Sequence, residues 1–251
     1  MLKKLALGVA VAMLCFTAAP TSAQEKSATK QGFELAANSN KKILVFRPSV
    51  SVGEQSTGGI FEPNAEWTER AKANIQAALE KHQKLLGNVV VAAPEAYGED
   101  AQKLEEHMLL FSALSQAVIE YQFFVGNRLP TKKRDSKADV FDWSMGASVA
   151  DLPGAKEADY ALFIYNKDAY GSTGRKVLQV LALLGPGIAV TSGEHQGFAG
   201  LVDLRTGDLL WLNADTQMGG DVREVDGSEK RVAQLLEDFP GSEALKKSVQ
   251  K

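Results

Sequence analysis

The sequence contains a single cysteine, Cys15, among 251 residues. Cys15 lies within an apolar run near the amino terminus. The residues before it, Ala12-Met13-Leu14, are bulkier than those that precede a lipidated cysteine, so we expect no lipid anchor at this position. Without a second cysteine, a disulfide framework and a thiolate metal site are both excluded.

Basic residues are also too few to suggest a nucleic-acid partner. The chain has 28 Lys and Arg against 31 Asp and Glu, a net charge of −3. Binding to phosphates needs clustered cations. The main basic run, Lys132-Lys133-Arg134, lies beside Asp135 and Asp139, which is typical of a solvated loop. We expect no nucleic acid to bind.

Motifs for nucleophilic catalysis are missing as well. There is no Gly-x-Ser-x-Gly elbow, and only three histidines could act as a base. His82 and His107 lie in charged helical segments. His195 is close in sequence to Ser192 and Glu194, but adjacent side chains point apart and rarely form a triad. We expect no catalytic residues; the alternative is an exported hydrolase with an unrecognised site near His195.

A phosphate loop and a metal site are likewise not expected. Residues 171–176 read Gly-Ser-Thr-Gly-Arg-Lys, but Arg175 interrupts the P-loop spacing and Val177 replaces its hydroxyl residue. No His-x-x-x-His pair is present, and the acidic segment 221–229 lacks the alternation of a calcium loop. We therefore predict a surface turn over 171–176, no cofactor and no metal.

The amino terminus does carry a recognisable pattern. Lys3 and Lys4 precede an apolar run over residues 5–19, and Thr21-Ser22-Ala23 supplies small residues at a cleavage site. This order is typical of a secretory signal peptide, and the run is shorter than the roughly 20 residues that span a bilayer. We expect cleavage before Gln24 and a periplasmic or secreted mature chain. Loss of two lysines makes its net charge about −5.

The remaining chain has the composition of a folded domain. Hydrophobic residues make up 45% of the sequence, enough for a substantial core. We predict a flexible tether over 24–40, an α/β domain over 41–240 and a tail over 241–251. The fold class expected is α/β (α+β mixed): a single domain with a mixed β-sheet of about five strands and helices packed on it.

Short apolar runs and helical periodicity place the elements. We expect strands at residues 43–46, 88–93 and 159–166, and a hairpin formed by 197–202 and 209–213. Helices are expected over about 64–87 with Asn64 as the N-cap, over about 100–125, over 141–150, and around 232–239. The glycine-containing segment after Pro48 predicts a long loop.

Residues Val177–Val190 form another apolar stretch. It is only about 14 residues long and contains Gly185-Pro186-Gly187, so it is too short and too broken to span a membrane. We expect a helical segment over 177–184 that is buried against the sheet. Contact of this stretch with a membrane surface is the less favoured alternative.

The predicted hairpin carries residues to which we assign structural roles. Asp203 can brace the turn, Thr206 and Gly207 form it, and Trp211 can cover the core. No residue in this segment is expected to act in chemistry.

Two segments resemble a known class of proteins. They are Ala158-Asp159-Tyr160-Ala161-Leu162 and Val202-Asp203-Leu204-Arg205-Thr206-Gly207-Asp208-Leu209-Leu210-Trp211. Both are similar to segments of bacterial envelope proteins with a domain related to the TolB amino-terminal domain, the curli-secretion lipoprotein CsgG and the activators of penicillin-binding proteins. The resemblance implies a periplasmic accessory domain without catalysis. This class has no shared functional residues to carry over.

Export, the absent catalytic motifs and this resemblance together suggest a function. We expect an exported, non-enzymatic accessory protein of the cell envelope that acts through protein–protein contacts with an envelope partner. Besides the hydrolase, a periplasmic carrier of a small ligand is a further alternative.

Overall fold

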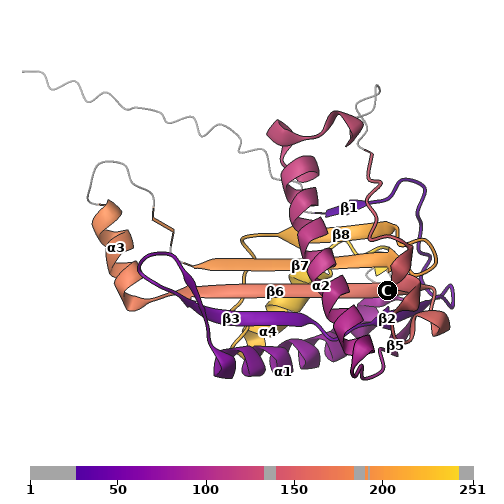
Figure 1. Cartoon of the computed structure of the whole chain (residues 1–251), viewed down its shortest axis with the longest axis horizontal. Helices are drawn as coiled ribbons and strands as arrows, with labels where there is room; N and C mark the ends of the chain where they lie inside the picture. Colours follow the sequence, from indigo (N-terminus) through magenta and orange to yellow (C-terminus); the bar gives the residue numbers. More distant parts are fainter. Residues whose placement is uncertain (1–26, 133–139, 184–189, 192, 243–251) are drawn as a thin grey trace, which may run out of the picture.

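The computed structural model describes residues 27–132, 140–183, 190–191 and 193–242, with a mixed sheet and helices on both of its faces (Figure 1). The predicted signal peptide, Cys15 and most of the predicted tail lie outside these ranges. The helices are α1 (Ala65–His82), α2 (Glu99–Val118), α3 (Thr173–Leu183) and α4 (Val225–Leu235). The strands are β1 (Ser27–Thr29), β2 (Lys42–Val45), β3 (Ser49–Gln55), β4 (Phe61–Pro63), β5 (Val89–Ala92), β6 (Tyr160–Gly171), β7 (Glu194–Asp203) and β8 (Leu209–Asp215).

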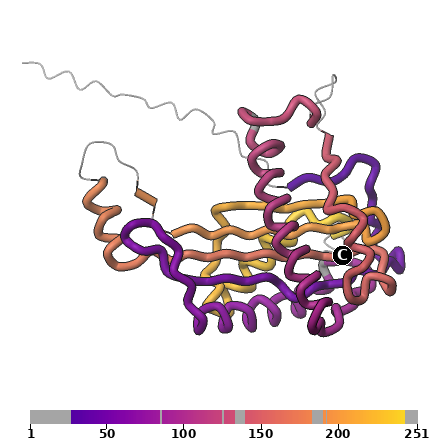
Figure 2. Tube along the Cα trace, in the orientation of Figure 1, coloured from indigo at the N-terminus to yellow at the C-terminus, as the bar shows by residue number. Residues whose placement is uncertain are grey.

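The predicted fold class is confirmed, although the sheet has eight strands in the described residues and not about five. The strand order is β1-β8-β7-β6-β2-β5. The strand pairs β6–β7, β7–β8 and β1–β8 are antiparallel, whereas β2 is parallel to both β5 and β6. Figure 2 shows the Cα trace in the same orientation, coloured along the sequence.

The 12-residue strand β6 organises the molecule. Its first residues pair with β2, and residues from Tyr165 to Gly171 pair with β3. β2 and β3 follow each other in the chain, and both run parallel to β6 along the same side of it. Pro48 therefore marks only a short break between these two strands. β6 therefore extends well beyond the part of the sheet that carries β2 and β5.

The two faces of the sheet hold separate cores. Side chains alternate between faces along a strand, so Leu162 and Ile164 of β6 pack with α1 and α4, while Ala161 and Phe163 pack with α2. In β7, Gly200 lies against the Phe111 ring of α2: a Cβ there would be 2.5 Å from the ring. The ring packs directly on the backbone because the residue is glycine.

Most of the predicted elements are confirmed by the structure. The Asn64 side chain accepts a hydrogen bond from the Trp67 backbone N–H at 2.9 Å and caps α1 as expected. Gly87, at φ 64°, follows the short 3₁₀ turn that extends this helix. The hairpin of β7 and β8 and the strands β2, β5 and β6 also form where predicted.

Three segments differ from the expectation. Residues 141–150 do not form one helix: Ser144 forms an isolated bridge with Asp208, and only Ala147–Asp151 form a short 3₁₀ helix. The segment after Pro48 is not a long loop but the β3–β4 hairpin, in which Gly53 is required because a Cβ would lie 2.2 Å from the Glu62 carbonyl oxygen. Residues 27–40 are not a flexible tether: β1 pairs with β8, and Leu35 is buried in the core. Polar composition alone concealed a strand that adds to an open sheet edge.

The apolar stretch that begins at Val177 is helical, but its predicted burial is wrong. It belongs to α3, which lies beyond the end of the sheet (Figure 1). Residues 184–189 lie outside the described part of the chain. None of the described helices combines the length and apolar character that a membrane crossing requires.

Candidate functional site

The two ends of β6 carry different clusters of polar residues. At its first end lies the β7–β8 turn, where Asp203 Oδ1 accepts hydrogen bonds from the backbone N–H groups of Arg205 and Thr206 at 2.8 and 3.0 Å. Gly207 has φ 77°, and Trp211 is fully buried. These four residues, singled out from the sequence, serve the turn and the core.

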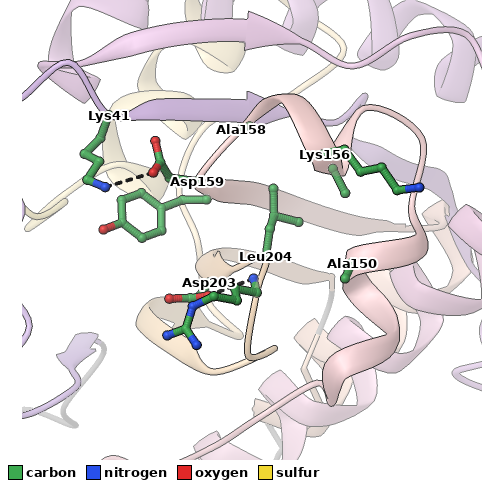
Figure 3. Close-up of a pocket in the computed structure, with 10 residues that line it drawn as sticks. Lys41, Ala150, Lys156, Ala158, Asp159, Asp203 and Leu204 are labelled. Carbon is green, nitrogen blue, oxygen red and sulfur yellow. Dashed lines mark hydrogen bonds and ion pairs between the residues drawn. The ribbon is translucent and has the colours of Figure 1, made fainter.

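A pocket of about 490 Å³ lies beside this turn (Figure 3). Its charged groups include Lys41 and Asp159, whose side chains form an ion pair at 2.8 Å. The hydrogen bond with Lys41 holds the pKa of Asp159 below its usual value, and the same bond raises the pKa of Lys41. Because both side chains are exposed to solvent, contact with a ligand would add little binding free energy at this pair.

The other end of β6 places polar residues on the face covered by α1 and α4. Asn166, Asp168 and Tyr170 alternate along the strand and therefore share that face. Asn166 and Asp168 are fully buried. A carboxylate without water is costly unless it is paired, and the pairing partner comes from α4.

Arg231 of α4 is fully buried and forms two parallel hydrogen bonds to Asp168, both at 2.8 Å. Its remaining N–H groups donate to Asn166 Oδ1 and to the carbonyl oxygens of Gly219 and Gly220. All five guanidinium donors therefore have acceptors. This saturation is what allows the charged pair to remain in the interior.

His195, on β7, contacts the same Asp168 carboxylate. Its Nδ1 lies 2.6 Å from Asp168 Oδ1, and 29% of its side chain is exposed. An ionised carboxylate can only accept, so Nδ1 carries the hydrogen and Nε2 presents a lone pair in the neutral ring. Nε2 lies next to Gly193, where a Cβ would be 3.1 Å away.

A second ion pair lies beside the first. Tyr170 donates its hydroxyl hydrogen to Asp221 Oδ1 at 2.7 Å, and Arg223 forms two hydrogen bonds to the same carboxylate. The Arg223 guanidinium lies 3.6 Å from the centre of the Tyr170 ring and 4.6 Å from that of Trp67. The bond from Arg223 lowers the pKa of Asp221 to about 2, while burial raises the pKa of Tyr170.

A pocket of about 280 Å³ opens between these groups and the start of α3. The residues that line it come from β3, α1, β6, α3, β7 and the segments before β7 and α4: Glu54, Trp67, Tyr170, Gly171, Thr173, Lys176, Gly193, His195 and Arg223. The set combines aromatic surface, both signs of charge and a histidine oriented by a buried carboxylate. We take this pocket as the candidate functional site.

The other residues weighed from the sequence lie elsewhere. His107 is bonded to the Lys103 carbonyl oxygen and to Ser148, and His82 ends α1. Glu194 accepts a hydrogen bond from Gln196, and no hydrogen bond or ion pair joins it to His195. Ser192 is outside the described residues.

The Gly-Ser-Thr-Gly-Arg-Lys motif forms the junction between β6 and α3. It is not an isolated surface turn, since Gly171, Thr173 and Lys176 line the candidate pocket. The Ser172 hydroxyl accepts a hydrogen bond from the Arg175 backbone N–H at 3.1 Å. The described residues contain no group of three or more potential metal ligands.

Sequence reasoning found His195 but missed its partners Asp168 and Arg231. The available signal was that Asn166, Asp168 and Tyr170 occupy alternate positions of β6, on the face that also carries the apolar Leu162 and Ile164. Polar residues at every second position of a buried strand indicate an internal cluster. The partner on α4 has no local signal, because Arg231 is 63 residues away from Asp168.

Comparisons with known proteins do not assign the chain. No protein-family model and no curated protein matches it. Two solved structures of a PelC dodecamer from Paraburkholderia phytofirmans are similar in part. One has 11% identity and a TM-score of 0.34, covering 86% of this chain and 97% of that one. The other has 12% identity and a TM-score of 0.32, with coverages of 84% and 93%.

Proposed function

We propose that this chain is an exported, non-enzymatic accessory protein of the cell envelope that acts through protein–protein contacts. The leader pattern at residues 1–23 and the resemblance to envelope domains support the location. The observation that carries the mode of action is the exposed apolar face of α3. Hydrolysis is less well supported, because the described residues that line the pocket at His195 include no serine and no cysteine.

The apolar side chains of α3 face solvent. Val177, Val180 and Leu181 are 54%, 58% and 59% exposed, and Leu178 is 38% exposed. These residues recur at helical spacing and form one continuous strip. Clustered apolar side chains on a surface favour a binding interface, because they lose water on contact.

The first turn of α3 is nevertheless held against the β3–β4 hairpin and the segment before β7. Arg175 donates from Nε to the Thr191 carbonyl oxygen at 2.8 Å and from Nη1 to the Thr57 carbonyl oxygen at 3.4 Å. Gly174 packs so closely on Thr57 that a Cβ would lie 2.4 Å from its hydroxyl oxygen. The helix is thus held in a defined position beyond the end of the sheet (Figure 2), and its apolar strip remains uncovered by the described residues.

A second copy of the chain offers a complementary surface on α2. Leu109 and Leu110 of α2 are exposed, and Glu105 and Glu106 lie one turn before them. α2 carries four acidic residues and one lysine, whereas α3 carries two basic residues and no acidic one. Contact between α3 of one copy and α2 of the next would match charge as well as apolar surface. Such a contact is heterologous, so each copy uses two different faces.

The chain purified from a periplasmic extract tests this proposal by light scattering coupled to size-exclusion chromatography. We expect the wild type to self-associate, and Val180→Asp or Leu109→Asp to be monomeric, because each buries a charge in the contact. A mixture of the two variants should form a dimer, since one retains α2 and the other retains α3.

Val225→Asp is the matched control, because Val225 is an equally exposed valine on α4. It should associate as the wild type does. The intact mass of the same sample reports removal of residues 1–23. A monomeric wild type, a mixture that stays monomeric, or a full-length chain found only in the cytosol would overturn the proposal.

A further inference from the structure

Two charged residues that have no ionic partner among the described residues line the pocket at the end of β6. Glu54 on β3 and Lys176 in the first turn of α3 both line the cavity. Within the described ranges, neither side chain has a hydrogen bond or an ion pair. They come from different elements but converge on one space of about 280 Å³, so the pocket presents one free charge of each sign.

The other charged groups around this space are already neutralised. Arg223 is bound by both oxygens of Asp221, and Asp168 is bound by Arg231 behind the pocket wall. These pairs fix the shape of the walls and leave little net charge. A ligand would therefore experience chiefly Glu54, Lys176 and the polar atom offered by His195.

His195 supplies that third polar contact. Its Nδ1–H is held by Asp168, so the neutral ring offers Nε2 as a hydrogen-bond acceptor on the Gly193 side of the pocket. His195 Nε2 and the Glu54 carboxylate are both hydrogen-bond acceptors, so together they suit a ligand with an ammonium group. Lys176 suits a carboxylate.

We propose that this pocket binds a small zwitterion, namely a free α-amino acid or a short peptide. The ammonium group contacts Glu54 and His195, the carboxylate contacts Lys176, and the side chain lies toward Trp67. A simple anion would leave Glu54 facing it as a repulsive group, and a simple cation would do the same with Lys176. A volume of about 280 Å³ lies just below the usual range of ligand pockets, roughly 300 to 1,000 Å³, which limits the ligand to a small molecule.

Binding of L-leucine and its two half-molecules to the purified chain tests the charge requirement. 4-Methylpentanoate has the carboxylate without the amine, and 3-methylbutylamine has the amine without the carboxylate. We expect saturable heat of binding with L-leucine and about tenfold or greater weakening for each half-molecule, equivalent to about 1.4 kcal/mol. L-leucylglycine in a parallel titration distinguishes a free amino acid from a short peptide.

Variants assign the binding to this pocket. Glu54→Gln and Lys176→Gln should each weaken L-leucine binding about tenfold, the loss of one charged contact. Glu62→Gln and Lys84→Gln remove the same charges from exposed positions outside the pocket and should bind as the wild type does. Glu62 is the closest match, because it is the β4 partner of Glu54.

The Val180→Asp variant separates this proposal from the preceding one, since it removes the docking contact and keeps all the pocket residues. It should bind L-leucine with wild-type affinity. Absence of saturable binding by both L-leucine and L-leucylglycine would overturn the proposal. Equal binding by 4-methylpentanoate, or unchanged affinity in Glu54→Gln and Lys176→Gln, would do so as well.

Discussion

An aspartate lies in an ion pair near each end of β6, and the two pairs differ in burial. Asp159, at the first end, pairs with Lys41 where both side chains remain in water. Asp168, at the other end, pairs with Arg231 where both are completely buried. The distances are the same, 2.8 Å. The difference in burial, together with the second hydrogen bond that Arg231 makes, therefore decides how much each pair matters to the folded state.

The two ends of β6 also differ in whether their polar groups face a pocket. The Asp159 end is closed by a tight turn whose polar groups are satisfied by its own backbone. The Asp168 end is built from several segments that are distant in sequence and leaves His195, Glu54 and Lys176 facing a pocket. A rigid buried ion pair beneath a partly open pocket is the arrangement expected of a preorganised binding site.

Replacement of Arg231 by Met should give the largest effect. It leaves the Asp168 carboxylate buried without its main partner, which costs about 3–5 kcal/mol of unfolding free energy. Lys41→Met should leave the urea midpoint unchanged within error, because Asp159 regains water. Urea unfolding at neutral pH measures both variants.

The double variant Asp168→Asn with Arg231→Met is the control for lost charge as opposed to lost packing. It should recover part of the stability lost in Arg231→Met, because no unpaired carboxylate remains. Similar losses in Arg231→Met and Lys41→Met would show that burial does not distinguish the two ends.

Glycine substitutions should reverse this order: Gly207→Ala, at the Asp159 end, should cost more stability than Gly193→Ala, at the Asp168 end. A Cβ at Gly207 would lie 2.0 Å from the Gly146 carbonyl oxygen, and φ is 77°, so we expect a loss of about 2–3 kcal/mol. At the other end, Gly193→Ala brings a Cβ only to 3.1 Å from His195 Nε2 and should cost about 1 kcal/mol.

Gly32→Ala isolates the backbone contribution to these losses. Gly32 has φ 78°, and a Cβ there would meet no atom within 4 Å. Thermal denaturation of the three variants should rank Gly207→Ala well below the other two. A Gly207→Ala variant as stable as Gly32→Ala would mean that the turn can move away from Gly146.

Features with local cues could be predicted from the sequence. Asn64 before a periodic apolar segment predicts a capped helix, and Asp203 and Gly207 between two apolar runs predict a hairpin. Each depends on residues a few positions apart. These predictions succeed because a side chain accepts hydrogen bonds from backbone N–H groups only two or three residues away.

Features made by distant residues could not be predicted. The β3–β4 hairpin depends on the fit of Gly53 against Glu62, and the Asp168–Arg231 pair joins residues far apart in the chain. The exposure of α3 was missed for a related reason. An apolar strip predicts that something covers it, but its periodicity does not say whether the cover belongs to the same chain.

Asp221→Asn should give a small effect with a distinctive pH dependence. The pKa of Asp221 is lowered from 3.8 to about 2 by Arg223, so its carboxylate stabilises the fold above about pH 4, and this contribution disappears as the pH falls toward 2. Because the side chain is 36% exposed, solvent screening reduces the expected contribution to about 1 kcal/mol. The difference in unfolding free energy between wild type and Asp221→Asn should therefore be constant above pH 4 and shrink below it. Asp159→Asn, at the more weakly held end, should show a smaller difference over the same range. A wild-type advantage over Asp221→Asn that persists unchanged at pH 2 would contradict this. It would mean that the hydrogen bond from the Tyr170 hydroxyl, and not the ion pair with Arg223, accounts for the contribution of Asp221 to stability.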